Sequence, residues 1–134
     1  MLSLNSGAYL LILYNKRNQN LKIGKNHSFL FPKGFLVYVG SAMNSLDKRI
    51  ARHLKKQKKL FWHIDFLTTN KNIEVIQVLA FPSKKRSECN LNSKVKALSD
   101  SSFAGFGCSD CKCNAHLHFF IENPLNSFKQ APFL

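Results

Sequence analysis

The sequence predicts a single α/β domain over residues 1–134, more narrowly of the α+β type, in which helices flank a small, mostly antiparallel central sheet. Three observations lead to this fold class. The length of 134 residues suffices for one hydrophobic core. The apolar fraction of 45% is far above that of a disordered basic tail. Segments with strand and helix patterns follow one another in the order strand, strand, helix, strand, helix, strand.

Strand patterns occupy four segments near the start of the chain, namely residues 7–14, 21–25, 28–31 and 35–39. The first segment, GAYLLILY, is apolar at consecutive positions, which is typical of a central strand buried on both faces. The next two are shorter and are separated from the fourth by Pro32 and Gly34, which favour a turn. The fourth segment, FLVYV, predicts a second central strand that ends at Gly40.

Two helices are expected in the rest of the chain, over residues 45–58 and from residue 83 or 87 to 98. Apolar residues recur at i, i+4 and i+8 from Leu46 in the first, and at i, i+4 and i+7 from Leu91 in the second. The remaining expectations are strands at 73–81 and 116–121, an irregular aromatic segment at 60–67, a loop at 99–114 and a frayed tail from 123.

The composition is strongly basic, because 20 Lys and Arg face only 7 Asp and Glu and give a net charge of +13. A surplus of this size on a folded domain attracts polyanions, and nucleic acid is the first candidate. We expect a basic stretch to contact phosphates without reading base sequence, through Lys48, Arg52, Lys55, Lys56, Lys58 and Lys59. The alternative for this stretch is a solvated helix face.

The sequence also bears on membrane insertion, on the compartment and on the state of the cysteines. The longest apolar run, residues 8–14, has seven residues, so we expect no membrane span. The first residues lack the pattern of a secretory signal, and we therefore expect a cytoplasmic protein. Three of the four cysteines fall within six residues, which in a reducing compartment indicates a metal site or free thiols before disulfides.

Polar side chains are expected to converge at one edge of the sheet. Tyr9 lies near the start of the first strand and Tyr38 near the end of the second, so antiparallel pairing brings both phenols to the same edge. Arg49 and His53 follow Leu46 by three and seven residues, which places them beside the apolar stripe of the first helix. From there both side chains can reach the sheet.

Glu88 precedes Leu91, the first residue of the apolar stripe of the second helix, by three positions, so its side chain lies in line with that stripe. A buried carboxylate needs a cation or a metal. Helical spacing alone leaves two readings even, namely a divalent cation and an internal ion pair with Arg49 or Lys48.

The segment that follows the first helix adds three candidates of lower rank. Trp62 either closes the core under the helix or stacks on a base. Asp65 either fixes the tautomer of His63 or holds a basic side chain.

These residues carry a resemblance to a known superfamily. Residues 6–9 (SGAY) and 38–42 (YVGSA) resemble the paired signature of the GIY-YIG nucleases, and residues 46–53 (LDKRIARH) resemble their arginine-bearing helix. Further blocks, such as WHID at 62–65, are similar to a small stand-alone subgroup of uncharacterised bacterial and archaeal members. The likeness spans about residues 6–121. The chain departs from the pattern in its Gly-Ala-Tyr motif and in the long separation of the two motifs.

The resemblance implies a metal-dependent endonuclease that hydrolyses phosphodiester bonds in DNA with one magnesium or manganese ion. It implies that Glu88 holds the cation and that Arg49 neutralises charge on the phosphoryl oxygens. It further implies that Tyr9 or Tyr38 accepts the proton of the attacking water. His53 orients the water or a tyrosine, or contacts phosphate; its alternative is an imidazole that packs the helix.

Cysteines and histidines near the C-terminus suggest a second metal. A structural zinc site formed by Cys89, Cys111, Cys113 and His116 would fix the Cys- and His-containing segment at about 105–121. The alternative is thiols that pack as small apolar groups.

Two other function classes stand beside the nuclease. One is a catalytically silent nucleic-acid-binding module of the same fold, and the other is a zinc-stabilised interaction domain. The sequence does not distinguish DNA from RNA. Because it contains no evident base-reading element, a protein partner is a candidate source of specificity.

Overall fold

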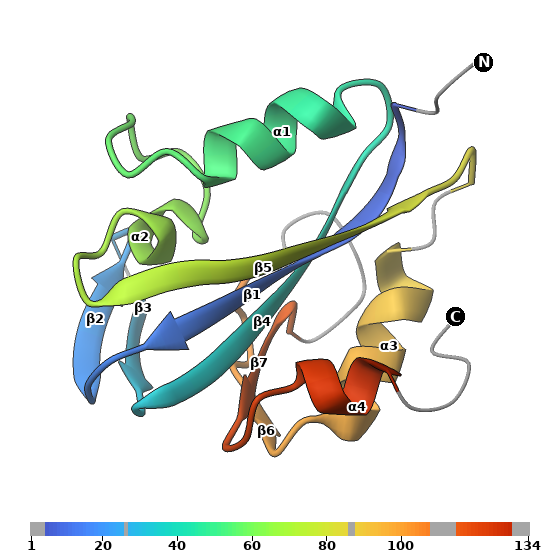
Figure 1. Ribbon diagram of the computed structural model, residues 1–134. Helices are drawn as coiled ribbons and strands as arrows, with labels where there is room; N and C mark the ends of the chain where they lie inside the picture. Colours follow the sequence, from blue (N-terminus) through green and yellow to red (C-terminus); the bar gives the residue numbers. More distant parts are fainter. Residues whose placement is uncertain (1–4, 26, 86–87, 108–114, 130–134) are drawn as a thin grey trace.

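The structure is a computed structural model, and it describes residues 5–25, 27–85, 88–107 and 115–129. Within these ranges the chain forms a five-stranded sheet of order β5-β1-β4-β7-β6 and a two-stranded sheet of β2 and β3 (Figure 1). The elements are β1 (Gly7–Asn15), β2 (Gln19–Ile23), β3 (His27–Phe31), β4 (Gly34–Ala42), α1 (Leu46–His53), α2 (Asp65–Thr68), β5 (Ile73–Pro82), α3 (Glu88–Leu98), β6 (Ser101–Ser102), β7 (Leu117–Phe120) and α4 (Leu125–Lys129). All strand pairings are antiparallel, which confirms the expected α+β class.

Strand β1 lies inside the main sheet, between β4 and β5. Its side chains alternate between two apolar clusters, as successive strand residues must. Tyr9 and Leu11 belong to one cluster, whereas Leu10 and Ile12 belong to the other. The expectation of a strand buried on both faces is therefore confirmed.

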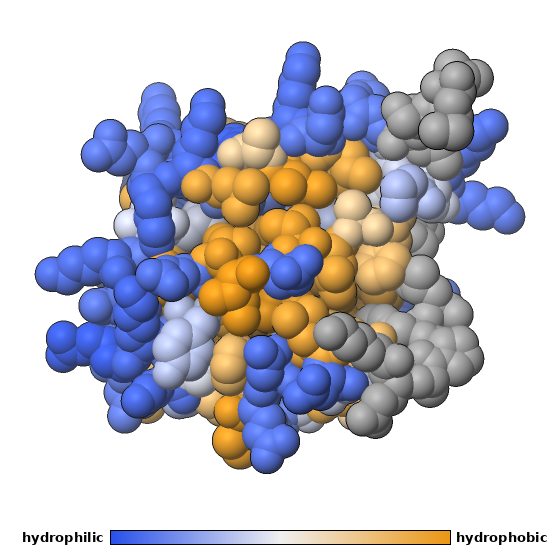
Figure 2. Space-filling view, in the orientation of Figure 1, coloured by the Kyte–Doolittle hydropathy of each residue, from blue (hydrophilic) through white to orange (hydrophobic). Residues whose placement is uncertain are grey.

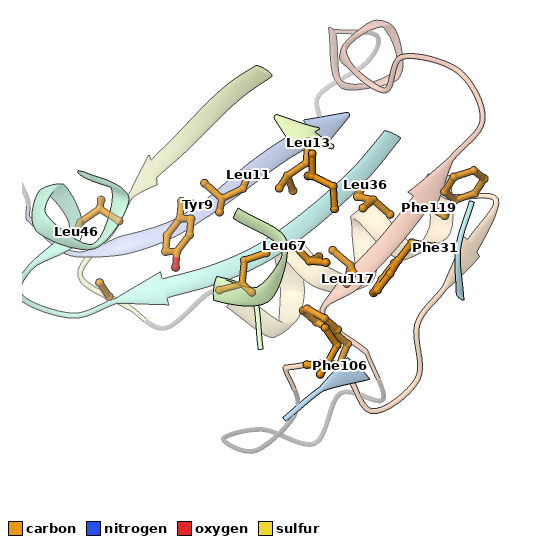
Figure 3. Packing of buried hydrophobic residues seen from close by; sticks show 14 residues of the cluster. Tyr9, Leu11, Leu13, Phe31, Leu36, Leu46, Leu67, Phe106, Leu117 and Phe119 are labelled. Atoms are coloured by element: carbon orange, nitrogen blue, oxygen red, sulfur yellow. The ribbon is translucent and has the colours of Figure 1, made fainter. Parts of the chain in front are cut away.

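Different elements cover the two faces of the sheet (Figure 1). The first cluster includes Leu46 of α1, Leu67 of α2 and Phe31 of β3, and its packing is drawn in Figure 3. The second cluster includes Val95 of α3 and Phe128 of α4. The main sheet is thus the middle layer, with the β2–β3 hairpin beside α1 and α2 on one face.

Figure 2 shows that apolar surface gathers in the middle of the face where β5 crosses the molecule, with hydrophilic side chains around it. Strand β5 is an outer strand of the sheet, and its Ile76 is 38% exposed. The charged side chains therefore border this face instead of covering it evenly. No helix within the described ranges is long and apolar enough to cross a membrane.

Helix α1 ends at His53, earlier than the expected residue 58. The basic run after it turns back, and the ammonium of Lys58 donates to the carbonyls of Arg52, at 2.8 Å, and His53, at 3.2 Å. A cation at these carbonyls satisfies acceptors that have no partner inside the helix and complements the negative end of its dipole. Leu54, the i+8 residue of the apolar repeat that starts at Leu46, therefore lies outside the helix and is 53% exposed.

Three further differences concern short elements, and a fourth concerns the apolar stripe of α3. Helix α2 lies in the segment expected to be irregular, and the two-residue strand β6 lies in the expected loop. Helix α4 lies in the tail expected to fray, where the ring of Phe128 packs edge-on against Phe120 at 5.8 Å. Leu98, expected on the buried stripe of α3, is 47% exposed. Strand β6 and helix α4 form through contacts with β7, which local periodicity does not encode.

Candidate active site

A cleft of about 870 Å³ opens at the edge of the sheet where β1 begins and β4 ends. The side chains expected to be catalytic all line it, and they come from β1, β4, α1 and α3: Tyr9, Tyr38, Arg49, His53 and Glu88. The expected convergence of the two tyrosines with Arg49 is therefore confirmed.

The register of β1 and β4 brings the tyrosines together. Tyr9 pairs with Gly40 and Leu11 with Tyr38, and the centroids of the two phenol rings are 6.5 Å apart. Gly40 is required for this arrangement, because a Cβ at that position would lie 2.4 Å from the Tyr9 hydroxyl oxygen. The glycine of the second motif thus lets the Tyr9 ring lie directly across β4.

Tyr9 and His53 form a buried pair beneath the cleft. The Tyr9 hydroxyl lies 2.7 Å from His53 Nε2, and both residues are 1% exposed. Burial lowers the pKa of His53 to about 4, and the nearby Lys58 cation adds to this shift. Burial, together with the neighbouring Tyr38, raises the pKa of the Tyr9 phenol above its usual value. At neutral pH, therefore, both groups are uncharged.

Arg49 is held so that its guanidinium faces the cleft. Its Nη1 donates to the carbonyl of Ser41 at 2.7 Å, and its guanidinium carbon lies 4.8 Å from the centre of the Trp62 ring. Among the described residues no carboxylate pairs with it. Its positive charge is therefore positioned for an anion that enters the cleft.

Glu88 is the first residue of α3, and its carboxylate reaches the other side of the cleft. Ser41 Oγ donates to its Oε1 at 2.5 Å, and His116 Nδ1 lies 3.3 Å from its Oε2. The ion pair with Arg49 or Lys48 that the sequence left open is thus replaced by contacts with Ser41 and His116. The side chain is 23% exposed, so the carboxylate remains accessible from the cleft.

This donor set fits magnesium or manganese. A carboxylate with a neighbouring hydroxyl offers hard oxygen ligands, and magnesium is commonly bound by one or two carboxylates together with water and substrate phosphates. Within the described ranges there is no group of three or more His, Cys, Asp or Glu side chains that could hold a metal without such additional ligands. Glu88 therefore suits a cation that is completed by substrate and water.

The zinc hypothesis remains a prediction. Cys111 and Cys113 lie outside the described residues. Cys89 is exposed and lines the cleft, whereas His116 is buried, with its Nδ1 3.2 Å from the carbonyl oxygen of Val39. Of the two candidates that the structure describes, Cys89 follows Glu88 directly in sequence, and His116 contacts the Glu88 carboxylate.

The basic stretch divides into two groups by the partners of its charged side chains, and contact of its six cations with phosphate stays a prediction. Arg52 binds Asp65 through two nitrogens, at 2.7 and 2.9 Å. Lys58 caps α1, as described above, and the ammonium of Lys56 donates to the carbonyls of Asn70 and Ile73. These three cations stabilise the fold because their charged groups already have protein acceptors. The other three side chains are exposed: Lys48, Lys55 and Lys59.

Asp65 and Trp62 organise the segment after α1. Asp65 is fully buried and binds the side chain of Arg52. Of the two roles expected for Asp65 from the sequence, this is the one in which it holds a basic side chain. It does not orient His63, whose Nδ1 instead accepts from the backbone N–H of Gly107 at 3.1 Å. Trp62 is partly buried, and the guanidinium carbons of Arg49 and Arg52 lie over its ring at 4.8 and 4.6 Å.

Two residues of the site, Ser41 and Phe61, were given no role from the sequence, although Ser41 lies within the second motif. Ser41 contacts both Arg49, through its carbonyl, and Glu88, through its hydroxyl. Phe61 lines the cleft although the segment around it gave no regular pattern. A serine after Gly40 is too common, and a phenylalanine in an aromatic run too ambiguous, to be singled out without the fold.

We expect the stability of the protein to fall as the pH decreases below about 6.5. The pKa of His53 and of His118 is lowered to about 4 by burial, from a usual value of 6.5. Between these values the unfolded chain binds protons that the folded chain does not, so unfolding becomes easier as the pH falls, by up to about 2.7 kcal/mol per pH unit for two groups. Urea unfolding at several pH values measures this slope.

A variant separates the contribution of one imidazole. His118 Nε2 donates to Asn92 Oδ1 at 2.7 Å and its Nδ1 accepts from Ser102 Oγ at 2.6 Å, a neutral tautomer. His118→Gln should flatten the pH dependence, whereas His27→Gln, at an exposed position, should not. A wild-type stability that is constant between about pH 7 and 5 would contradict the buried, neutral state of both imidazoles.

The comparisons with known proteins name a family but no activity. The family model described as "Domain of unknown function DUF123" matches residues 8–132. Neither the curated proteins nor the solved structures include a match to this chain.

Proposed function

This chain belongs to the DUF123 family of domains of unknown function, and we propose that it is a metal-dependent endonuclease that hydrolyses phosphodiester bonds in DNA. One observation carries the proposal: the side chains that bear the resemblance to GIY-YIG nucleases, although separated by up to 79 positions in sequence, line a single cleft, namely Tyr9, Tyr38, Arg49, His53 and Glu88. A set of tyrosine, arginine, histidine and glutamate in one cleft combines proton transfer, charge neutralisation and metal binding.

Arg49 supplies the fixed positive charge that phosphoryl transfer requires. A guanidinium bears a delocalised positive charge and presents several N–H donors in one plane. Because the Ser41 carbonyl and the Trp62 ring already hold the guanidinium in place, little reorganisation is needed when charge develops on the phosphoryl oxygens. We assign this neutralisation to Arg49.

Tyr9 and His53 form the proton path. With the imidazole proton on Nδ1, His53 Nε2 accepts the phenolic proton of Tyr9 while the phenolic oxygen takes a proton from the attacking water. This relay avoids a free phenolate, which burial of Tyr9 disfavours. Because burial lowers the pKa of His53 to about 4, the imidazolium that forms gives up its proton readily, and His53 acts as a transient proton carrier. Tyr38 lies beside the pair, with its ring centroid 6.2 Å from that of His53, and is the alternative acceptor.

Glu88 is the residue that would hold the magnesium or manganese ion, with Ser41 beside it. When bound, such an ion supplies positive charge that polarises the phosphate and stabilises the leaving oxygen. His116 orients the Glu88 carboxylate from the buried side. As the partner we propose DNA, and as the compartment the cytoplasm, where the thiols stay reduced.

Incubation with plasmid, single-stranded and branched DNA in magnesium or manganese tests the proposal. We expect cutting that needs the metal, is lost in Arg49→Ala and persists in Lys71→Ala, an exposed lysine outside the cleft. Wild-type protein that binds all three substrates and cuts none would instead support the catalytically silent binding module.

Binding of DNA should depend on the three exposed lysines of the basic stretch. Each phosphate contact contributes about 0.9 to the slope of log K against log salt. The triple variant Lys48→Gln, Lys55→Gln and Lys59→Gln should therefore lower that slope by up to about 3. Fluorescence anisotropy over a series of salt concentrations measures the slope.

A matched variant controls for the change in net charge. It replaces three exposed lysines from the β2–β3 region and the turn that follows: Lys22, Lys25 and Lys33. If both triple variants lowered the slope equally, DNA would be attracted by net charge alone, and the basic stretch would have no special role.

A further inference from the structure

Phe61 has the largest exposed fraction, 77%, of the large apolar residues within the described ranges. It lies where the segment after α1 meets the cleft and is one of the residues that line it. A flat aromatic ring left in water beside a binding cleft is costly unless a ligand covers it. Its position therefore points to a group that enters with the substrate.

The backbone that carries the Phe61 ring is fixed, and the ring has one aromatic neighbour. The backbone N–H of Phe61 donates to Asp65 Oδ2 at 2.8 Å, and Asp65 is itself fully buried and bound to Arg52. The Phe61 ring meets Trp62 edge-on, with centroids 5.4 Å apart and an angle of 82° between the planes. Such pre-organisation lowers the entropy cost of binding a flat ligand.

Trp62 does not offer a comparable free surface. Two guanidinium groups, from Arg49 and Arg52, already lie over its ring. Trp62 thus supports the site, and Phe61 is the aromatic side chain whose face remains open to a ligand.

The basic residues that precede Phe61 in the chain, and Arg49 in the same cleft, indicate the class of ligand. No acidic residue occurs between Asp47 and Asp65 in the sequence, and the exposed Lys55 and Lys59 come shortly before Phe61. A site that combines cations with an open aromatic face suits a nucleotide, which carries a phosphate and a flat base. An apolar peptide would leave these cations without a partner.

We propose that Phe61 stacks on an unpaired nucleobase next to the phosphodiester bond in the cleft, so that the substrate is DNA with single-stranded or branched structure. This assignment rests on the proposed function of the same site. In a continuous duplex each base is already stacked on its neighbours, so its face is not available to a ring at the rim of a cleft. Single strands, flaps and junction arms expose such faces.

Affinity measured by fluorescence anisotropy, in EDTA so that no cutting occurs, tests the assignment. Phe61→Ala should weaken binding of a single strand about tenfold, as expected for the loss of one stacked base, and should leave a blunt duplex of equal length unchanged. Phe61→Tyr should retain affinity, whereas Phe61→Leu, which is apolar but not flat, should lose it. Ile121→Ala is the matched control, since Ile121 is 68% exposed and lines a separate pocket.

An abasic site in the single strand provides the second arm. If Phe61 stacks on a base, one abasic position should weaken wild-type binding about tenfold and should cost the Phe61→Ala variant nothing further. Equal loss for single strand and duplex, or affinity retained by Phe61→Leu, would overturn the assignment. The binding assay contains no cleavage step, so it tests stacking separately from the proposed nuclease. Stacking by Phe61 can be found in a protein that does not cut DNA, and DNA can be cut by a protein in which Phe61 has no effect on binding.

Discussion

Glu88→Gln should lower the rate of DNA cleavage by at least about 10²-fold, the scale seen when one electrostatic contact to a transition state is removed. The amide has the shape of the carboxylate and can still accept from Ser41 Oγ. It lacks the negative charge that a magnesium or manganese ion requires. DNA affinity should change little, because Glu88 contributes no attraction to phosphate.

Single-turnover cleavage in manganese, paired with anisotropy for binding, measures both quantities. Glu122→Gln is the matched control, since Glu122 is exposed and lies outside the cleft. Wild-type rates in Glu88→Gln would show that the carboxylate holds no catalytic cation. A large loss of DNA affinity in the same variant would indicate a structural role instead.

Asp65→Ala should lower the free energy of unfolding by about 3–5 kcal/mol, as when one partner of a buried ion pair is removed. Burial alone would raise the pKa of Asp65, but hydrogen bonds from Arg52 and from the backbone of Trp62 and Phe61 outweigh it and lower that pKa. The substitution leaves the backbone N–H groups of Phe61 and Trp62 without this acceptor and leaves Arg52 only the carbonyl of Lys59. It should also release the segment that carries Phe61 and Trp62.

Urea unfolding of Asp65→Ala beside Glu74→Ala makes the comparison. Glu74 forms an ion pair with Lys16 that is about half exposed on both sides, and its loss should cost less than about 1 kcal/mol. Similar losses for both variants would mean that Asp65 contributes no more than a surface charge.

The framework of the site could be predicted from the sequence because strands constrain their side chains strongly. The unbroken apolar run of β1 identified a central strand, and antiparallel pairing then fixed which ends of β1 and β4 meet. Tyr9 and Tyr38 followed from that pairing. Helical spacing from Leu46 placed Arg49 and His53 on the face toward the sheet, where His53 is now found against Tyr9.

What the sequence did not predict depends on partners that are distant along the chain. Arg52 and Asp65 are 13 positions apart, and Ser41 and Glu88 are 47 apart, so no local pattern links them. A lysine in a basic run looks the same whether it faces solvent or, like Lys58, caps a helix. The division of the basic stretch therefore required the fold.

Hydrolysis by this cleft is tested most directly by the masses of DNA strands after incubation with wild-type protein and manganese in water labelled with oxygen-18. We predict shortened strands that appear only with the metal and carry one labelled oxygen in each newly formed terminal phosphate. Strands of unchanged mass at all times, in both magnesium and manganese and under conditions where the protein is bound to the DNA, would contradict the proposed nuclease.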